Sequence, residues 1–187
     1  VRFDIVFYVR MKDGLSQIII NVEAQKDEPT GYEILNRAIF YVSRLISSQK
    51  ERDFENSSYD DIKRVYSIWV CMNMDESSMS HVHLTKEDLI GSYEWKGNLD
   101  LLNIIMLGLA KNLPEHDETY ELHRLLGALL SKELTIDEKL NIIGNEYDIP
   151  IEENFRKDVS VMCNLSQGIK EDGIAIGEAG LIMKMYK

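Results

Sequence analysis

The chain has 187 residues, a formal net charge of −11 at pH 7, and 44% hydrophobic residues. This length suits one well-packed domain or a core with a helical appendage, and no apolar run approaches a membrane span. The acidic balance argues against a generic nucleic-acid binder, which usually has a basic face. Basic residues nevertheless cluster in the first third and acidic ones accumulate from Asp75 onward, so a nucleic acid can meet that third alone.

Residues 2–25 predict a β-hairpin, because Asp13-Gly14 separates two apolar, β-branched runs. A two-residue turn there sets the register, which places Lys12 opposite Leu15 and Asp4 opposite Glu23. The alternation predicts one apolar, core-facing surface. Its residues are Phe3, Ile5, Phe7, Val9, Ile18, Ile20, Val22 and Ala24.

The other face of this hairpin gathers its polar groups at the open end, where Asp4, Glu23 and Gln25 converge. Two carboxylates directly opposed on a sheet repel each other, so a cation is expected beside them. Carboxylate oxygens together with water and a substrate phosphate suit Mg²⁺, which keeps much of its water. Such a metal lowers the pKa of bound water and neutralises charge during phosphodiester hydrolysis.

The next element is a predicted helix over residues 32–49. Its apolar stripe comprises Leu35, Ala38, Ile39, Val42, Leu45 and Ile46. The opposite, polar stripe comprises Arg37, Tyr41, Arg44 and Ser48. A buried strand over residues 65–72 then follows, and the strand–helix–strand crossover predicts that it runs parallel to its partner.

Beyond this strand, residues 81–84 suggest an edge strand in which His81 and His83 share a face. Two histidines at this spacing can ligate zinc, but ordinary strand histidines are favoured because no third ligand is identifiable nearby. Helices are then predicted over 98–111, 117–134 and 135–147, the last with a capping box at Thr135–Glu138, and a fourth begins near Ile151. Cys71 and Cys163 are interpreted as buried free thiols of a cytoplasmic protein.

Asp4 followed by Glu23-Ala24-Gln25 resembles the D…(D/E)-x-K signature of the PD-(D/E)XK nuclease superfamily. E-x-Q followed by a helix with Arg37 and Tyr41 is similar to the transposase-associated branch, the recombination-promoting nucleases, in which glutamine commonly replaces lysine. The resemblance continues through the predicted strand RVYSIWVCMN and the helical second half to a glycine-spaced tail. It therefore covers essentially the whole chain.

This resemblance implies an α/β fold with a restriction-endonuclease-like core over residues 1–97, a mixed sheet with flanking helices. It also implies that a helix preceding the first strand is missing from this sequence. Residues 98–187 would form a mostly helical region with a glycine-spaced tail, through whose helices copies of the chain could pair as a homo-oligomer.

The resemblance further implies a metal-dependent DNA endonuclease linked to recombination or a mobile element. Asp4 and Glu23 would bind Mg²⁺ or Mn²⁺, Gln25 would complete the catalytic set, and Arg37 and Tyr41 would support it or bind phosphate. Gln25 can position water by a hydrogen bond but takes up no proton at neutral pH. Two alternatives stay open: a nuclease-derived DNA- or protein-binding module without useful catalysis, and an unrelated α/β protein with a chance match.

Overall fold

The computed structural model describes residues 5–10, 17–25 and 29–160. The chain divides into two compact units, Val1–Asn112 and Leu113–Lys187. The first unit contains a mixed β-sheet and one long helix, and the described part of the second unit is helical. The protein is therefore a mixed α/β protein, as the sequence predicts.

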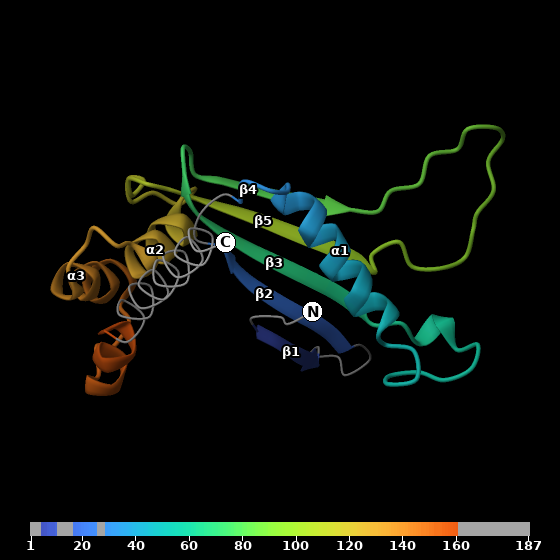
Figure 1. Cartoon of the computed structure of the whole chain (residues 1–187), viewed down its shortest axis with the longest axis horizontal. Coiled ribbons are helices and arrows are strands. Elements are labelled where there is room, and N and C mark those ends of the chain that lie inside the picture. Colours follow the sequence, from blue (N-terminus) through green and yellow to red (C-terminus); the bar gives the residue numbers. More distant parts are fainter. Residues whose placement is uncertain (1–4, 11–16, 26–28, 161–187) are drawn as a thin grey trace, which may run out of the picture. The chain divides into compact units, whose positions relative to one another are not determined.

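The sheet has five strands in the order β1-β2-β3-β5-β4 (Figure 1). They are β1 (Ile5–Arg10), β2 (Gln17–Gln25), β3 (Arg64–Met74), β4 (Ser78–His83) and β5 (Leu102–Ala110). The three central strands, β2, β3 and β5, are parallel to one another. The outer strands β1 and β4 are antiparallel to their neighbours. Each has six residues, so both edges of the sheet are formed by short strands.

The hairpin register is confirmed for the described residues of β1 and β2. Ile5 pairs with Val22, and the ladder continues to Arg10 opposite Gln17, which is the register that a two-residue Asp13-Gly14 turn dictates. The predicted pairs Lys12–Leu15 and Asp4–Glu23 involve residues that lie outside the described part of the chain.

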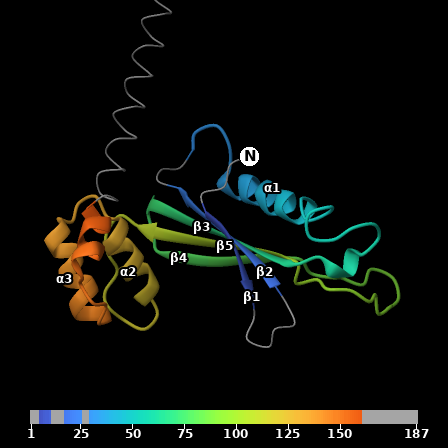
Figure 2. The same cartoon turned by 90° about the horizontal axis from the view of Figure 1, so that it is seen from below.

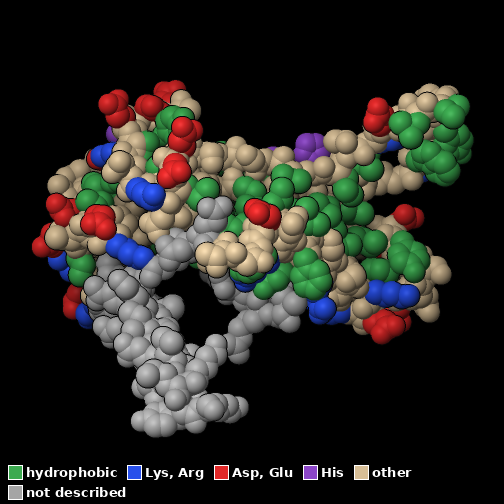
Figure 3. All heavy atoms as spheres, turned by 45° about the horizontal axis from the view of Figure 1, so that its top comes forward, with side chains coloured by type: hydrophobic (Ala, Val, Ile, Leu, Met, Phe, Trp, Pro, Cys, Tyr) green, Lys and Arg blue, Asp and Glu red, His purple; other side chains and the backbone are tan. Residues whose placement is uncertain are grey.

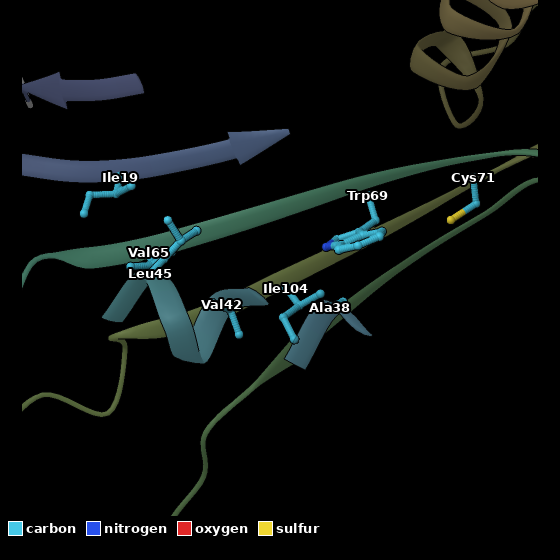
Figure 4. Packing of buried hydrophobic residues seen from close by; sticks show 8 residues of the cluster. All are labelled: Ile19, Ala38, Val42, Leu45, Val65, Trp69, Cys71 and Ile104. Carbon is cyan, nitrogen blue, oxygen red and sulfur yellow. The ribbon is translucent and has the colours of Figure 1, made fainter. Parts of the chain in front are cut away.

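The helix α1 (Ile34–Ser47) connects β2 to β3 and covers one face of the sheet (Figure 2). Both the helix and the parallel pairing of β2 with β3 confirm the sequence prediction. Ala38, Val42 and Leu45 of α1 are buried against the sheet. With them pack Ile19, Val65, Trp69, Cys71 and Ile104, which together form the core of the first unit (Figure 4).

The prediction of which hairpin face is buried was wrong. Ile19, Asn21 and Glu23 lie under α1 and are at most 3% exposed, whereas Ile18 and Ile20 on the opposite face are only half-buried. Three consecutive isoleucines put apolar side chains on both faces, so alternation alone does not distinguish them.

The predicted stripes of α1 also need correction. Leu35 and Ile39, expected in the core, are 40% and 42% exposed, and Tyr41, expected on the polar side, packs against the core. The small side chain of Ala38 lies at the centre of the contact and is completely buried. Because α1 is apolar around most of its circumference, helical spacing did not identify the buried arc.

The predicted helix over residues 98–111 is wrong, because this segment contains the strand β5. A continuous apolar run satisfies the helical and the buried-strand patterns equally well. The adjacent β-branched pair Ile104-Ile105 favours a strand, and β5 lies between β3 and β4. The side chain of Asn98, the first residue of the predicted helix, accepts a hydrogen bond from the Asp100 N–H at 2.9 Å within a turn.

The second unit contains α2 (Glu121–Leu130), α3 (Ile136–Tyr147) and a helical segment over residues 153–160. The capping box that starts α3 is confirmed. The Thr135 hydroxyl accepts from the Glu138 N–H at 3.3 Å, and the Glu138 carboxylate accepts from the Thr135 N–H at 2.8 Å. The α2 helix is shorter than predicted, since its first turn is preceded by a turn in which the Asp117 carboxylate accepts two backbone N–H groups.

A bidentate ion pair joins α2 to the last turn of α3. Arg124 donates from Nε and Nη2 to the two carboxylate oxygens of Glu146 at 2.6 and 2.7 Å, and from Nη1 to the Pro114 carbonyl at 2.8 Å. Two parallel charge-assisted bonds make this stronger than an ordinary surface ion pair. The hydrogen bond from Arg124 lowers the pKa of the Glu146 carboxyl below its usual value.

We expect the Glu146→Gln substitution to lower the free energy of unfolding by about 1 kcal/mol at neutral pH. Because the folded pKa of Glu146 is depressed, its contribution exists above the unfolded pKa and is lost as pH falls through the folded value. The wild type and the variant should therefore converge in acid. Thermal unfolding of the full chain at neutral pH and at about pH 3.5 tests this, with the exposed Glu118→Gln as a control that should change nothing. A difference that persists unchanged in acid would contradict it.

Candidate functional site

Glu23 and Gln25 lie at the carboxyl end of β2, on the sheet face that α1 covers. Glu23 is only 3% exposed, and Gln25 is half-buried. A carboxylate removed from water to this extent is costly unless a cation or strong hydrogen bonds compensate it. The surroundings of Glu23 are therefore the candidate functional site.

Arg37 reaches from α1 to both residues. Its Nη2 lies 4.0 Å from Glu23 Oε2, and its Nη1 donates to Gln25 Oε1 at 3.3 Å. This places a cation beside the buried carboxylate, as the sequence predicted for this end of the hairpin. The guanidinium is held in place by the glutamine amide as well as by the charge of Glu23.

Three aromatic side chains surround the guanidinium of Arg37. The Tyr32 and Tyr41 hydroxyls accept hydrogen bonds from it at 2.9 and 3.1 Å, and its central carbon lies 5.0 Å from the Tyr41 ring and 5.3 Å from the Trp69 ring. Burial lowers the pKa of Arg37, but the hydrogen bonds to Tyr41 and Tyr32 outweigh that effect and raise it. Arg37 is thus a fixed, permanently charged group.

A buried polar row continues from Glu23 along the sheet. Trp69 of β3 is paired with Glu23, and Ser67 is paired with Asn21, so these four side chains share the face under α1. The Ser67 hydroxyl accepts from Trp69 Nε1 at 2.9 Å and from Asn21 Nδ2 at 3.2 Å, and both Asn21 and Ser67 are fully buried. Ser67 therefore fixes the Trp69 ring against which Arg37 stacks.

We expect the Ser67→Ala substitution to destabilise the chain by about 1–3 kcal/mol, although it removes a single oxygen atom. It leaves the Trp69 indole N–H and the Asn21 amide N–H buried without this acceptor, and an unmet buried donor costs more than a hydrogen bond contributes. Unfolding in urea followed by tryptophan fluorescence measures the change. Ser80→Ala, at an exposed position of β4, is the matched control, and equal stability of the two variants would contradict the prediction.

The structure brings together four of the five predicted site residues, Glu23, Gln25, Arg37 and Tyr41, and the fifth, Asp4, lies outside the described residues. Glu23 and Gln25 offer carboxylate and amide oxygens, the hard donors that Mg²⁺ prefers, and this donor chemistry fits the ion. Over residues 5–10, 17–25 and 29–160, no group of three or more His, Cys, Asp or Glu side chains is placed to hold a metal. Asp4, the second carboxylate of the predicted pair, lies outside these residues.

His81 and His83 do share a face of β4, with ring centroids 4.7 Å apart. His81 Nε2 lies 2.8 Å from Asn103 Oδ1, a hydrogen bond to the neighbouring strand β5. A hydrogen bond of this kind between neighbouring strands is the arrangement expected of His81 as an ordinary strand histidine. Cys71, the cysteine in the described part of the chain, is a buried free thiol whose pKa is raised by burial.

Sequence reasoning did not identify Tyr32, Ser67, Trp69 or Asn21 as parts of this site. One signal was available: Asn21, like Glu23 and Gln25, is a polar residue at alternate positions of an otherwise apolar strand, which marks one face of β2. Tyr32 carries no such signal, because it lies before the first turn of α1 and meets Arg37 only in the folded chain.

The fold and the site define an α/β protein whose candidate site lies at the carboxyl end of an interior strand. In open α/β sheets this end is the usual place for ligands. The chain matches no protein-family model, no curated protein and no solved structure. In the described part of the chain, the helices are all too short or too polar to cross a membrane.

Proposed function

We propose that this chain is a metal-dependent DNA endonuclease. The observation that supports this most directly is the nearly complete burial of the Glu23 carboxylate beside Gln25 and the guanidinium of Arg37. A buried carboxylate in contact with a specific charge partner is a pattern that recurs at functional sites. The resemblance of the D…E-x-Q pattern to the PD-(D/E)XK nucleases gives the reaction class.

In this proposal Asp4 and Glu23 hold a Mg²⁺ or Mn²⁺ ion. When bound, the ion supplies a low-pKa water and neutralises charge on the phosphate. The residues of the chain position and hold these groups. Gln25 can hydrogen-bond a water or a phosphate oxygen, and Arg37 keeps a positive charge at the site while it orients the Gln25 amide. The aromatic rings of Trp69 and Tyr41 lie beside the Arg37 guanidinium. Apolar neighbours lower the local dielectric constant, which strengthens the electrostatic effect of the guanidinium.

The first unit holds 13 basic and 17 acidic residues, so contact with DNA has to depend on individual exposed cations and not on net charge. Lys50, three residues after the end of α1, is exposed, and Arg52, which pairs with Asp53, is about half exposed. Phosphate contacts by such side chains supply sequence-independent affinity that decreases with salt. We therefore propose that DNA approaches along the first unit.

The test is nicking of supercoiled plasmid by the full chain with Mg²⁺, with Mn²⁺ and with a chelator. The proposal requires metal-dependent nicking that disappears in both Glu23→Ala and Asp4→Asn. If the wild-type chain neither cuts DNA nor binds these metals more tightly than the two variants do, the endonuclease proposal is wrong.

One observation favours a second function, a nuclease-derived DNA-binding module. Arg37 already provides a cation 4.0 Å from Glu23, and Gln25, which accepts from Arg37, takes up no proton at neutral pH. A site of this kind is stable without metal. DNA binding by the full chain that is indifferent to metal, together with the absence of nicking, would support this function over the first.

A further inference from the structure

A long segment between β4 and β5 exposes an unusual amount of apolar surface. We call residues 84–101 the arm; they form turns and extended chain without helix or strand. Ile90 is 98% exposed, Leu89 85%, Trp95 77%, Tyr93 66% and Leu99 52%. Figure 3 shows hydrophobic side chains gathered at its tip. Loops of this length are uncommon and usually functional, and clustered exposed apolar groups mark interaction sites.

The arm has internal contacts that shape it. Lys86 Nζ donates to the Tyr93 carbonyl at 2.9 Å and pairs with Asp88 at 2.8 Å, and the Ser92 hydroxyl donates to Asp88 at 3.3 Å. The rings of Tyr93 and Trp95 meet edge to face with centroids 4.9 Å apart. A surface that is ordered before binding loses less entropy when a partner docks.

A second unusual surface is the outer face of α1, opposite its buried residues. The solvent side of an amphipathic helix normally carries charged residues. Here the outer face consists of the seven exposed residues of α1, of which only Arg44 is charged. They are Leu35, Asn36, Ile39, Phe40, Ser43, Arg44 and Ser47.

The two surfaces complement each other in charge. Of the two arginines in α1, Arg37 contacts Glu23 and Gln25, and Arg44 lies on the outer face with its guanidinium 6.0 Å from the Phe40 ring. The arm contains four acidic residues and two lysines; Asp88 pairs with Lys86, and Asp100 pairs with Arg64. An acidic arm is unsuited to a nucleic acid, whose phosphates it would repel. It suits an apolar surface edged by arginine.

We propose that the arm of one copy of this chain docks on the outer face of α1 in a second copy, and that the contact is reciprocal. Within one chain the arm extends away from α1 (Figures 1 and 2), and both surfaces remain exposed, so neither covers the other. Each copy carries both halves of the contact. A reciprocal contact closes two copies into a two-fold dimer, the commonest symmetry among homo-oligomers.

The area is adequate for such a dimer. A buried aromatic side chain contributes about 150–250 Å², and Tyr93 and Trp95 are 66% and 77% exposed. With the aliphatic residues of the arm and the matching face of α1, each contact buries several hundred Å². Two reciprocal contacts reach the roughly 1,200–2,000 Å² that specific interfaces bury.

The test is the mass of the full chain in solution, measured by sedimentation equilibrium over a range of concentrations. We expect a dimer for the wild type. The arm variant Tyr93→Ser/Trp95→Ser and the helix variant Ile39→Ser/Phe40→Ser should each weaken dimerisation by roughly 30-fold or more, as loss of central aromatic contacts does. Met79→Ser, which removes a side chain 59% exposed on β4, is the control and should leave the dimer intact.

Mixing the two variants gives the discriminating result. A dimer of either variant alone has no intact arm–helix contact. A mixed dimer retains one, between the arm of the helix variant and the helix of the arm variant. Differently labelled arm and helix variants should therefore associate with each other more tightly than either does with itself. Circular dichroism confirms that each variant is folded. A monomeric wild type at about 100 μM would overturn the proposal, since a specific interface of this size binds far more tightly. A dimer that the helix variant leaves unchanged would show that the arm docks elsewhere and would overturn it equally.

Discussion

Metal-dependent nicking is expected to fall by about 10³-fold when Glu23 is replaced by glutamine. The substitution preserves the size of the side chain and leaves an oxygen that still accepts hydrogen bonds, but it removes the negative charge. A metal bound in part by this carboxylate supplies several kcal/mol of charge stabilisation, and each 1.36 kcal/mol corresponds to a tenfold change in rate. The loss should appear in the rate at saturating DNA, since the ion acts on the reaction and contributes little to binding the duplex.

The matched control for this experiment is Glu33→Gln, an exposed glutamate directly before α1. It changes the net charge by the same amount and should leave nicking within about twofold. The free energy of unfolding of both variants is measured as well, because a Glu23→Gln variant that fails to fold would lose nicking whether or not Glu23 binds the metal. A Glu23→Gln variant that is folded, binds DNA and still nicks plasmid at the wild-type rate would contradict the assigned role of Glu23.

Local signals predicted the elements that position the site. The Asp13-Gly14 dipeptide predicted the hairpin register, the strand–helix–strand order predicted the parallel pairing of β2 with β3, and the capping box predicted where α3 begins. Each of these features depends on residues close together in the sequence, or on the handedness of a single connection. For the same reason, Glu23 and Gln25 could be assigned to one face of one strand.

What the sequence did not predict depends on which surface each element packs against. Residues 18–20 are apolar on both faces, and α1 is apolar around most of its circumference, so the buried side of each was misjudged. The segment over residues 102–110 satisfies the helical pattern but lies between two strands. In each case the buried side or the type of element depends on the residues that it packs against in the folded chain. These residues are distant in the sequence, so no local pattern identifies them.

The same limit explains which parts of the site were missed. Arg37, Tyr41 and Gln25 were expected near the carboxylates because of the resemblance, but Tyr32 and Trp69, which also hold Arg37, were not. Trp69 meets Arg37 only because β3 pairs with β2 in the observed register, and Tyr32 meets it only because of how the chain enters α1. The predictions from sequence thus contain the charged groups and one of the three aromatic residues around Arg37, and the structure adds the other two.

Replacing Arg37 with methionine is expected to lower the free energy of unfolding by about 2–4 kcal/mol. Methionine retains much of the apolar stem of arginine, so the main loss is the cation beside a carboxylate that is only 3% exposed. Removing one member of a buried ion pair weakens the compensation of the charge that stays behind, and this costs more than the pair contributes. In a Glu23→Gln background the same Arg37→Met change should cost at least 1 kcal/mol less, because the charge that needed a partner is gone.

Adding Mg²⁺ to the Arg37→Met variant then distinguishes the two proposed functions. A metal ligand that has lost its internal cation should bind the ion more tightly, and a ligand at 100 times its dissociation constant stabilises the folded state by about 2.7 kcal/mol. If Glu23 is a metal ligand, Mg²⁺ should therefore raise the melting temperature of Arg37→Met more than that of the wild type, and should leave the double variant Glu23→Gln/Arg37→Met unchanged. A melting temperature that is indifferent to Mg²⁺ in all three chains would contradict a metal-ligand role for Glu23 and would favour the binding module.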